Sequence, residues 1–76
     1  MLAFILCKLE AGQEHDALTK IKEISNVKDV YLTFGGWDAI VIAEAHTMEK
    51  LGALIVGEIR ATKGVNMTET LITTGF

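Results

Sequence analysis

The sequence predicts an α+β sandwich in which one four-stranded antiparallel sheet carries two helices on one face. Three observations predict it: four segments have the composition of strands, two segments between them repeat apolar residues at helical spacing, and their order is βαββαβ. Because crossover connections are right-handed, this order places both helices on the same face. The length of 76 residues allows one domain, residues 1–76.

The first strand and the first helix are expected at residues 2–9 and 13–25. A short apolar run that ends before Ala11-Gly12 is typical of a strand. Both alternate sets of this run are apolar, so we expect both of its faces to be buried. Asn26 can adopt the left-handed conformation that ends the helix. The apolar positions of the helix recur every three or four residues: Ala17, Leu18, Ile21 and Ile24.

The centre of the chain has the pattern of a β-hairpin. Residues 27–34 and 38–45 are rich in β-branched and aromatic residues and read as the second and third strands. Gly35 and Gly36 lie between them, and glycine reaches positive φ without a steric penalty, so a turn is expected there. Residues 65–74, which are rich in threonine, are expected to form the last strand.

The second helix is expected from residue 48 to about residue 62. Thr47 suits its N-cap, and Gly64 suits the position after its end. The expected apolar stripe consists of Met48, Leu51, Leu54, Ile55 and Ile59. Gly52 and Gly57 each cost about 1 kcal/mol relative to alanine in a helix interior, and close packing against the sheet would be a reason for them. The whole pattern is that of the ferredoxin-like sandwich.

Composition excludes several classes of function. The net charge is −3 and the seven Lys and Arg residues are scattered, so we expect no nucleic-acid partner. No apolar run has membrane-spanning length, and no membrane partner is expected. Cys7 is the only cysteine, which excludes an internal disulfide and favours a reduced, cytoplasmic setting. We see no catalytic set, no metal-ligand spacing and no cofactor motif, so no enzyme activity is expected.

The sheet is expected to pair with a second sheet. Two helices cover one face only, yet the first and third strands carry apolar residues on both faces. A domain of this size also has a marginal core, which oligomerisation can supplement. The sequence therefore predicts a homodimer formed through the open face of the sheet.

Three short motifs in order resemble a known family. They are Val27-x-x-Val30, Gly35-Gly36-Trp37-Asp38 and Gly64-Val65-x-x-Thr68-x-Thr70. Together they resemble the effector domain of the Lrp/AsnC transcription regulators, also called the RAM domain. Trp37 stands where the family has Tyr or Phe, and Lys63 replaces a proline. Met1 leads directly into the first strand, so the chain resembles a stand-alone effector module without the helix-turn-helix, and DNA binding is not carried over.

The resemblance implies a small-molecule sensor. Dimers of the family form through their sheets and assemble into octamer or decamer rings, with amino acids bound where dimers meet. Its implied partners are an amino-acid ligand and full-length regulators of the same family. By position, the implied ligand-binding residues are Gly35, Gly36, Trp37, Asp38, Thr68 and Thr70. Glycine N–H groups would face the ligand carboxylate, Asp38 would accept from its ammonium group, and Trp37 would form an apolar wall.

Other interpretations of these residues stay open. Gly35-Gly36 can serve the turn alone, and Asp38 can bond the backbone of its own turn. Trp37 can be an anchor at the dimer interface, and the threonines can reflect strand propensity. At the level of function, the alternatives are a small ferredoxin-like dimeric enzyme of oxygenase or isomerase type, and an oligomer without a ligand. A closed cavity with ionisable groups between sheet and helices would favour the enzyme.

Overall fold

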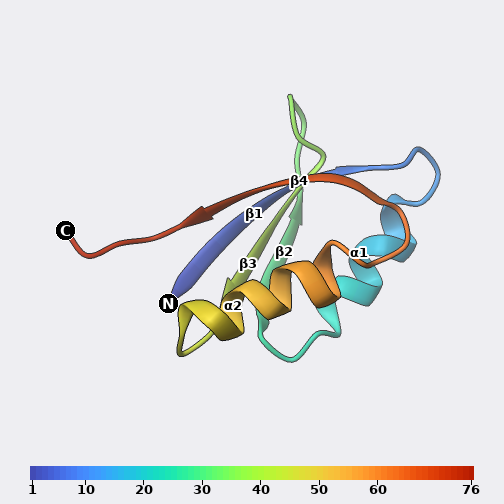
Figure 1. Ribbon diagram of the computed structural model, residues 1–76. Helices are drawn as coiled ribbons and strands as arrows, with labels where there is room; N and C mark the ends of the chain where they lie inside the picture. Colours follow the sequence, from blue (N-terminus) through green and yellow to red (C-terminus); the bar gives the residue numbers. More distant parts are fainter.

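The computed structural model describes residues 1–76 and has the expected βαββαβ order, with both helices on one side of a sheet (Figure 1). The strands are β1 (Leu2–Leu9), β2 (Val27–Leu32), β3 (Ala39–Glu44) and β4 (Val65–Ile72). The helices are α1 (Glu14–Lys22) and α2 (Met48–Leu54), and α2 continues into the π-helical segment η1 (Ile55–Ile59). Neither helix is long and apolar enough to cross a membrane.

The strands form one antiparallel sheet in the order β2-β3-β1-β4. β1 and β3 are therefore central, and β2 and β4 are the edges. This arrangement confirms the ferredoxin-like fold predicted from the order of the elements. The register of β1 against β4 shifts between Lys8 and Leu9, which marks a bulge near one end of the sheet.

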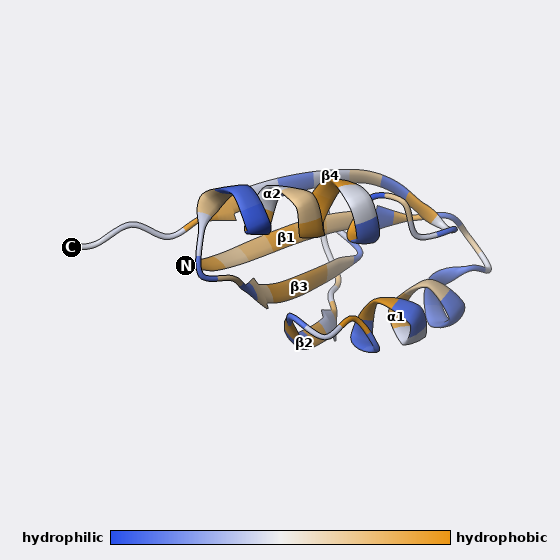
Figure 2. Cartoon of the chain, turned by 60° about the horizontal axis from the view of Figure 1, so that its bottom comes forward, coloured by the Kyte–Doolittle hydropathy of each residue, from blue (hydrophilic) through white to orange (hydrophobic).

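The core lies between the sheet and the helices and consists of 15 buried residues, all of them apolar. Figure 2 shows that β1 and β3 are hydrophobic along most of their length. One alternate set of each central strand faces the core: Ala3, Ile5, Cys7 and Leu9 from β1, and Ala39, Val41 and Ala43 from β3. Ile21 of α1 and Leu51 of α2 are fully buried against them. No polar or charged residue is buried.

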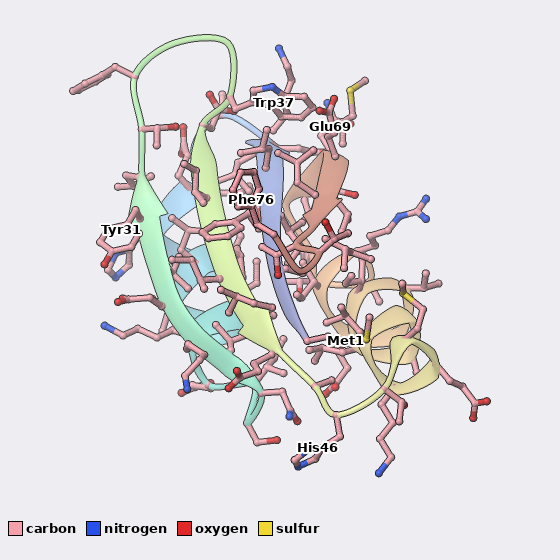
Figure 3. All side chains as sticks on the ribbon, turned by 90° about the vertical axis from the view of Figure 1, so that its left-hand side faces the viewer. Met1, Tyr31, Trp37, His46, Glu69 and Phe76 are labelled. Atoms are coloured by element: carbon pink, nitrogen blue, oxygen red, sulfur yellow. The ribbon has the colours of Figure 1, made fainter.

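The other face of the sheet is apolar and uncovered (Figure 3). Phe4 lies between Ile42 and Leu71 in the register, and Leu6 lies between Ile40 and Glu69. Leu71 is 51% exposed at the edge of this face. The helices thus cover one face only, as expected, and pairing with a second sheet stays a prediction.

Several predicted boundaries are wrong. α1 ends at Lys22, and tight bonds from Ile24 N–H to the Ile21 carbonyl (3.0 Å) and from Glu23 N–H to the Lys20 carbonyl (3.2 Å) close its last turn. Asn26 does not adopt a left-handed conformation, since no residue other than glycine has positive φ. Its side chain instead donates to the carbonyl of Glu44 at 3.0 Å. A polar side chain that finds a partner on a neighbouring strand has no need of a local cap.

β2 and β4 also end earlier than predicted, at Leu32 and Ile72. After β2, the backbone N–H and the side chain of Thr33 make hydrogen bonds within the hairpin loop. The pairing of β2 with β3 therefore ends before Phe34. Thr73 is the last residue that bonds β1, through its N–H to the Leu2 carbonyl at 3.0 Å. The ends of these strands depend on hydrogen bonds that composition does not reveal.

The second helix contains a wide turn that the sequence reading missed. Arg60 N–H donates to the carbonyl of Ile55 at 2.8 Å, the i+5 bond of a π-helix. In a regular α-helix, Glu58 would lie on the same side as Leu51, Leu54 and Ile55, which are all buried. The wide turn adds a residue, so Glu58 is exposed and Ile59 is buried instead.

One further expectation for this helix is wrong, and the reason considered for its glycines does not apply. Met48 does not belong to the buried stripe, since it is 53% exposed. Gly52 and Gly57 do not pack closely on the sheet, because a Cβ atom at either position would meet nothing within 4 Å. Thr47 is confirmed as the N-cap, since its Oγ1 accepts from Lys50 N–H at 3.1 Å.

Candidate functional site

The hairpin loop between β2 and β3 is closed by its own hydrogen bonds. Thr33 N–H donates to the carbonyl of Asp38 at 2.9 Å, and Thr33 Oγ1 donates to the carbonyl of Trp37 at 2.6 Å. Gly35 has φ +137°, which favours glycine, and nothing lies within 4 Å of a Cβ atom at Gly35 or Gly36. Phe34 is fully exposed beside them. The loop is therefore ordered internally and open to solvent.

Asp38 joins this loop to the central strand β1. Its Oδ2 accepts from Leu9 N–H at 2.8 Å, and its own N–H donates to the carbonyl of Cys7 at 2.8 Å. The side chain therefore bonds the backbone of β1, beside the bulge, and not its own turn. The second carboxylate oxygen, Oδ1, makes no hydrogen bond within the chain, so it can still accept one from a ligand.

Trp37 lies at one end of the uncovered sheet face, close to Glu69 in the view of Figure 3. The side chain is half-buried, and Lys8 Nζ lies 5.8 Å from the ring centroid. That distance is within the range of a cation–π contact. Trp37 thus presents an aromatic surface at the rim of the face that is predicted to dimerise.

Thr68 and Thr70 lie on the other side of the sheet from Trp37. In the register of β1 with β4 they are opposite Cys7 and Ile5, whose side chains face the helices. Both threonines are half-buried. Within a single subunit, the four hairpin residues 35–38 therefore lie together, but Thr68 and Thr70 do not lie beside them.

The surface has three cavities, and none of them is lined by residues 35–38. One, of about 230 Å³, lies between the end of η1 and the start of β4. It is lined by Arg60, Val65, Asn66, Met67 and Thr68. Sequence reasoning proposed Thr68 but missed Arg60 and Asn66. Arg60 has no acidic residue three or four positions away in the chain, so it carries little local signal, and only the fold places it beside β4.

The other two cavities lie at the opposite end of the sheet, around Asn26 and Glu44. Polar groups there satisfy one another: Lys28 Nζ lies 3.1 Å from Glu44 Oε1, the only salt bridge in the chain. The hydrogen bond from Lys28, together with its positive charge, lowers the pKa of Glu44. Both side chains are more than half exposed, so this pair adds little to stability.

The remaining titratable groups with shifted pKa values do not form a reactive centre. Burial raises the pKa of the Cys7 thiol to about 11, which keeps it protonated at neutral pH. The hydrogen bond from Tyr31 to Asp29 (2.9 Å), together with the charge of that carboxylate, raises the pKa of Tyr31. No group of three or more His, Cys, Asp or Glu side chains is placed to hold a metal ion.

Comparisons with known proteins agree with this fold. The chain matches the family described as the Lrp/AsnC ligand binding domain over residues 2–75. It is 34% identical over 74 residues to the HTH-type transcriptional regulator FL11 of Pyrococcus furiosus, which covers 95% of this chain and 47% of that protein. The crystal structure of FFRP-DM1 superposes with a TM-score of 0.92 at 34% identity, over 96% of this chain and 97% of that chain.

A transcriptional regulator of Neisseria meningitidis, solved as a complex with L-Met, shares the fold with a TM-score of 0.89 at 14% identity, over 97% of this chain and 49% of that chain. The chain spans about half the length of the regulators that it matches, 49% of a Pyrococcus horikoshii regulator and 47% of FL11. Since the family match extends over nearly all of its residues, the chain belongs to the family of Lrp/AsnC ligand-binding domains.

Proposed function

We propose that this chain is an effector-sensing and oligomerisation module that binds an amino acid or a related metabolite at contacts between subunits. The observation that carries the proposal is the position of the hairpin tip. Trp37 lies at the rim of the uncovered apolar face, and Asp38 keeps one carboxylate oxygen free. A ligand held there would lie at the margin of this face, where a subunit of another dimer can contact it.

The chemistry of the tip suits an amino acid. Gly35 and Gly36 leave their backbone N–H groups open to a carboxylate, because no side chain shields them. Asp38 Oδ1 can accept a charge-assisted hydrogen bond from an ammonium group. The half-buried Trp37 ring offers an apolar wall for the ligand side chain. The ligand class comes from the family and from the L-Met complex of the Neisseria regulator.

Thr68 and Thr70 enter this proposal as contributions from a neighbouring subunit. Within one chain they lie on the helix-facing side of the edge strand β4, away from Trp37. A hairpin tip from one dimer placed against β4 of another would bring the two motifs together. This geometry requires contact between dimers. The proposal therefore includes further assembly of the homodimer, into the octamer or decamer ring that the resemblance implies. It also includes a cytoplasmic location and association with full-length regulators of the family.

A ligand screen with an isosteric variant tests the proposal. The native protein should show a rise in melting temperature with at least one of the standard amino acids. Asp38→Asn keeps an oxygen for Leu9 N–H but removes the charge, so it should lose that rise and keep its mass in light scattering. Asp29→Asn, which lies away from the tip, serves as the control. Absence of any stabilising amino acid for the native protein would count against the sensor.

The alternative of a small dimeric enzyme finds less support. Such an enzyme would need a closed cavity with ionisable groups between sheet and helices. That space is filled by 15 buried apolar residues, and the cavities lie at the surface. A binding module at subunit contacts accounts for both the filled core and the open face.

A further inference from the structure

We infer that residues 73–76 form an arm that lies against a second copy of this chain, with Phe76 packed on the Tyr31 ring of that copy. The inference rests on the homodimer of the proposed function and names a contact that holds its two sheets together. None of the residues proposed for the ligand site takes part in it.

The arm leaves the sheet at a fixed point. Thr73 is tied to β1, since its N–H and its Oγ1 both donate to the carbonyl of Leu2 at 3.0 Å. After Thr73 the only hydrogen bond is local, from Thr74 Oγ1 to the carbonyl of Gly75 at 3.5 Å. Figure 1 shows this segment extending away from the body of the subunit, on the side opposite the helices. The arm therefore lies in solvent on the uncovered side of the sheet.

Phe76 finds no apolar contact within its own subunit, because its side chain is fully exposed. Tyr31 of the same chain is out of reach. β4 and β2 are opposite edges of the sheet, separated by three strand spacings or about 14 Å. The three residues after Thr73 span at most about 10 Å when extended. The arm is therefore too short to cross its own sheet.

The length of the arm matches the spacing of two packed sheets. Sheets that pack face to face lie about 10 Å apart, which is also the reach of three extended residues. An arm that crosses this distance brings Phe76 to the level of the second sheet. In Figure 3 Phe76 lies in front of the uncovered face, on the side from which a second sheet would approach.

Tyr31 is the receiving group on the second subunit. It lies opposite Ile40 in the register, so it belongs to the uncovered face, and it is 52% exposed at the β2 edge. Its Oη donates to Asp29 Oδ2 at 2.9 Å, which holds the ring in one orientation. A second aromatic ring placed on it would gain more than the burial of area alone.

The symmetry of a homodimer supplies this contact twice. A two-fold axis parallel to the strands places β4 of each subunit over β2 of the other. In Figure 3 Phe76 lies at about the level of Tyr31 along β2, and rotation about an axis parallel to β2 keeps that level. An axis across the strands would place β4 over β4 and leave both Tyr31 rings exposed. Burial of apolar surface therefore favours the first arrangement.

A double-mutant cycle on the dimer tests the inference. Light scattering over a dilution series gives the dissociation constant of the native dimer and of each variant. Phe76→Ser and Tyr31→Ser should each weaken the dimer by about tenfold, the scale of truncating an aromatic group at an interface. Because both variants remove the same contact, the double variant should also lose about tenfold, and not the product of about a hundredfold.

Two further variants serve as controls. Tyr31→Phe keeps the ring and should weaken the dimer by less than about twofold, since the hydroxyl group bonds only within its own subunit. Val56→Ser removes an exposed apolar side chain on the helix side and should also change the dissociation constant by less than about twofold. Native dispersion of the amide signals shows that each variant is folded.

Contact between subunits is observed directly in a dimer mixed from ¹³C-labelled and unlabelled protein. We expect nuclear Overhauser effects between the Phe76 ring of one subunit and the Tyr31 ring of the other. With a dimeric native protein, three results would overturn the inference: no loss in Phe76→Ser, losses that multiply in the double variant, or effects from Phe76 only within its own subunit.

Failure of the arm and failure of the proposed function are distinguishable. A native protein that stays a single subunit removes the homodimer and the arm with it. A dimer that does not depend on Phe76 removes only the arm. If the dimer depends on Phe76 while no amino acid stabilises the native protein, the sensor proposal fails and the arm stands.

Discussion

At the scale of single residues, Gly64 has two reasons to be glycine. Its φ is +96°, and a Cβ atom there would lie 3.0 Å from Gln13 Cβ and 3.2 Å from Ala17 Cβ. The carbonyl of Gly64 also accepts from Glu10 N–H at 2.8 Å, which ties the end of η1 to the loop after β1. The residue that was expected only to end a helix thus also permits close packing against α1.

Gly64→Ala should therefore destabilise the protein by about 2 kcal/mol, from left-handed strain together with overpacking. Urea unfolding at one protein concentration measures the change. Gly75→Ala is the control, since it has neither a positive φ nor a neighbour within 4 Å. A change below about 0.5 kcal/mol for Gly64→Ala, the range of ordinary surface substitutions, would contradict the packing described.

Cys7 should make stability depend on alkaline pH. Burial raises its pKa from 9.0 to about 11, so the unfolded chain loses this proton first as pH rises. The contribution is complete below pH 9 and is lost between pH 9 and about 11. The native protein should lose about 2 kcal/mol more than Cys7→Ala over this interval. Urea unfolding at both ends of the interval measures it, and equal slopes for the two proteins would show that the thiol ionises without cost in the fold.

At the scale of elements, the wide turn in η1 decides which side of the second helix is buried. Ile59 is fully buried and Glu58 is exposed, although a regular helix would place Glu58 on the same side as Leu51. The signal was present in the sequence, since an acidic residue at the centre of an apolar stripe conflicts with a regular helix. The sequence does not show how the helix resolves this conflict. The π-turn becomes evident only once the helix is packed on the sheet.

Glu58→Leu tests the wide turn directly. In the structure described, the substitution should change the free energy of unfolding by no more than about 0.5 kcal/mol, because the side chain stays in solvent. A regular helix would bury the new leucine and add about 1.5 to 3 kcal/mol. Urea unfolding distinguishes these outcomes, and Ile59→Ala should cost about 2 to 5 kcal/mol as the buried counterpart.

Gly52 weakens its helix without a packing benefit in the single subunit. Since a Cβ atom at this position meets nothing within 4 Å, Gly52→Ala should stabilise the protein by up to about 1 kcal/mol in thermal or urea unfolding. Gly35→Ala is the contrasting variant and should destabilise, because φ is +137° there. A loss of stability in Gly52→Ala would show that another subunit occupies the space beside the helix.

At the scale of the whole molecule, the main feature is the uncovered apolar face of the sheet. Phe4 lies at its centre, between Ile42 and Leu71, and is half-buried in a single subunit. A second sheet would remove this surface from water, as the hydrophobic effect favours. The open face and the filled core on the other side together make a dimer the simplest way to complete the fold.

Phe4→Lys should break the dimer that we propose. A charge at the centre of an apolar interface should weaken association by more than about 2 kcal/mol, or roughly thirtyfold. Light scattering over a dilution series should then reveal the 8.3 kDa subunit at concentrations where the native protein is dimeric. Val56→Lys, an exposed apolar residue on the helix side, is the control and should stay dimeric. A native protein that already scatters as a single subunit would contradict the proposed interface.

The sequence by itself determined the number, type and order of the elements, whereas only the structure showed which alternate set of β1 faces the core. Number, type and order follow from local periodicity, which each segment carries independently of the others. The apolar residues on both faces of β1 and β3 likewise predicted that one apolar face of the sheet is left uncovered by the helices. The family resemblance, which depends on short motifs in order, is confirmed by the match over residues 2–75.

Only the tertiary structure decided how distant residues meet. The bond from Leu9 N–H to Asp38 joins residues 29 positions apart. It gives Asp38 a structural partner that its own turn did not suggest. The tertiary structure alone also places Arg60 beside Thr68, and it places Thr68 on the opposite side of the sheet from Trp37. Register and strand order set these contacts through pairings between distant segments, and no local pattern contains that information.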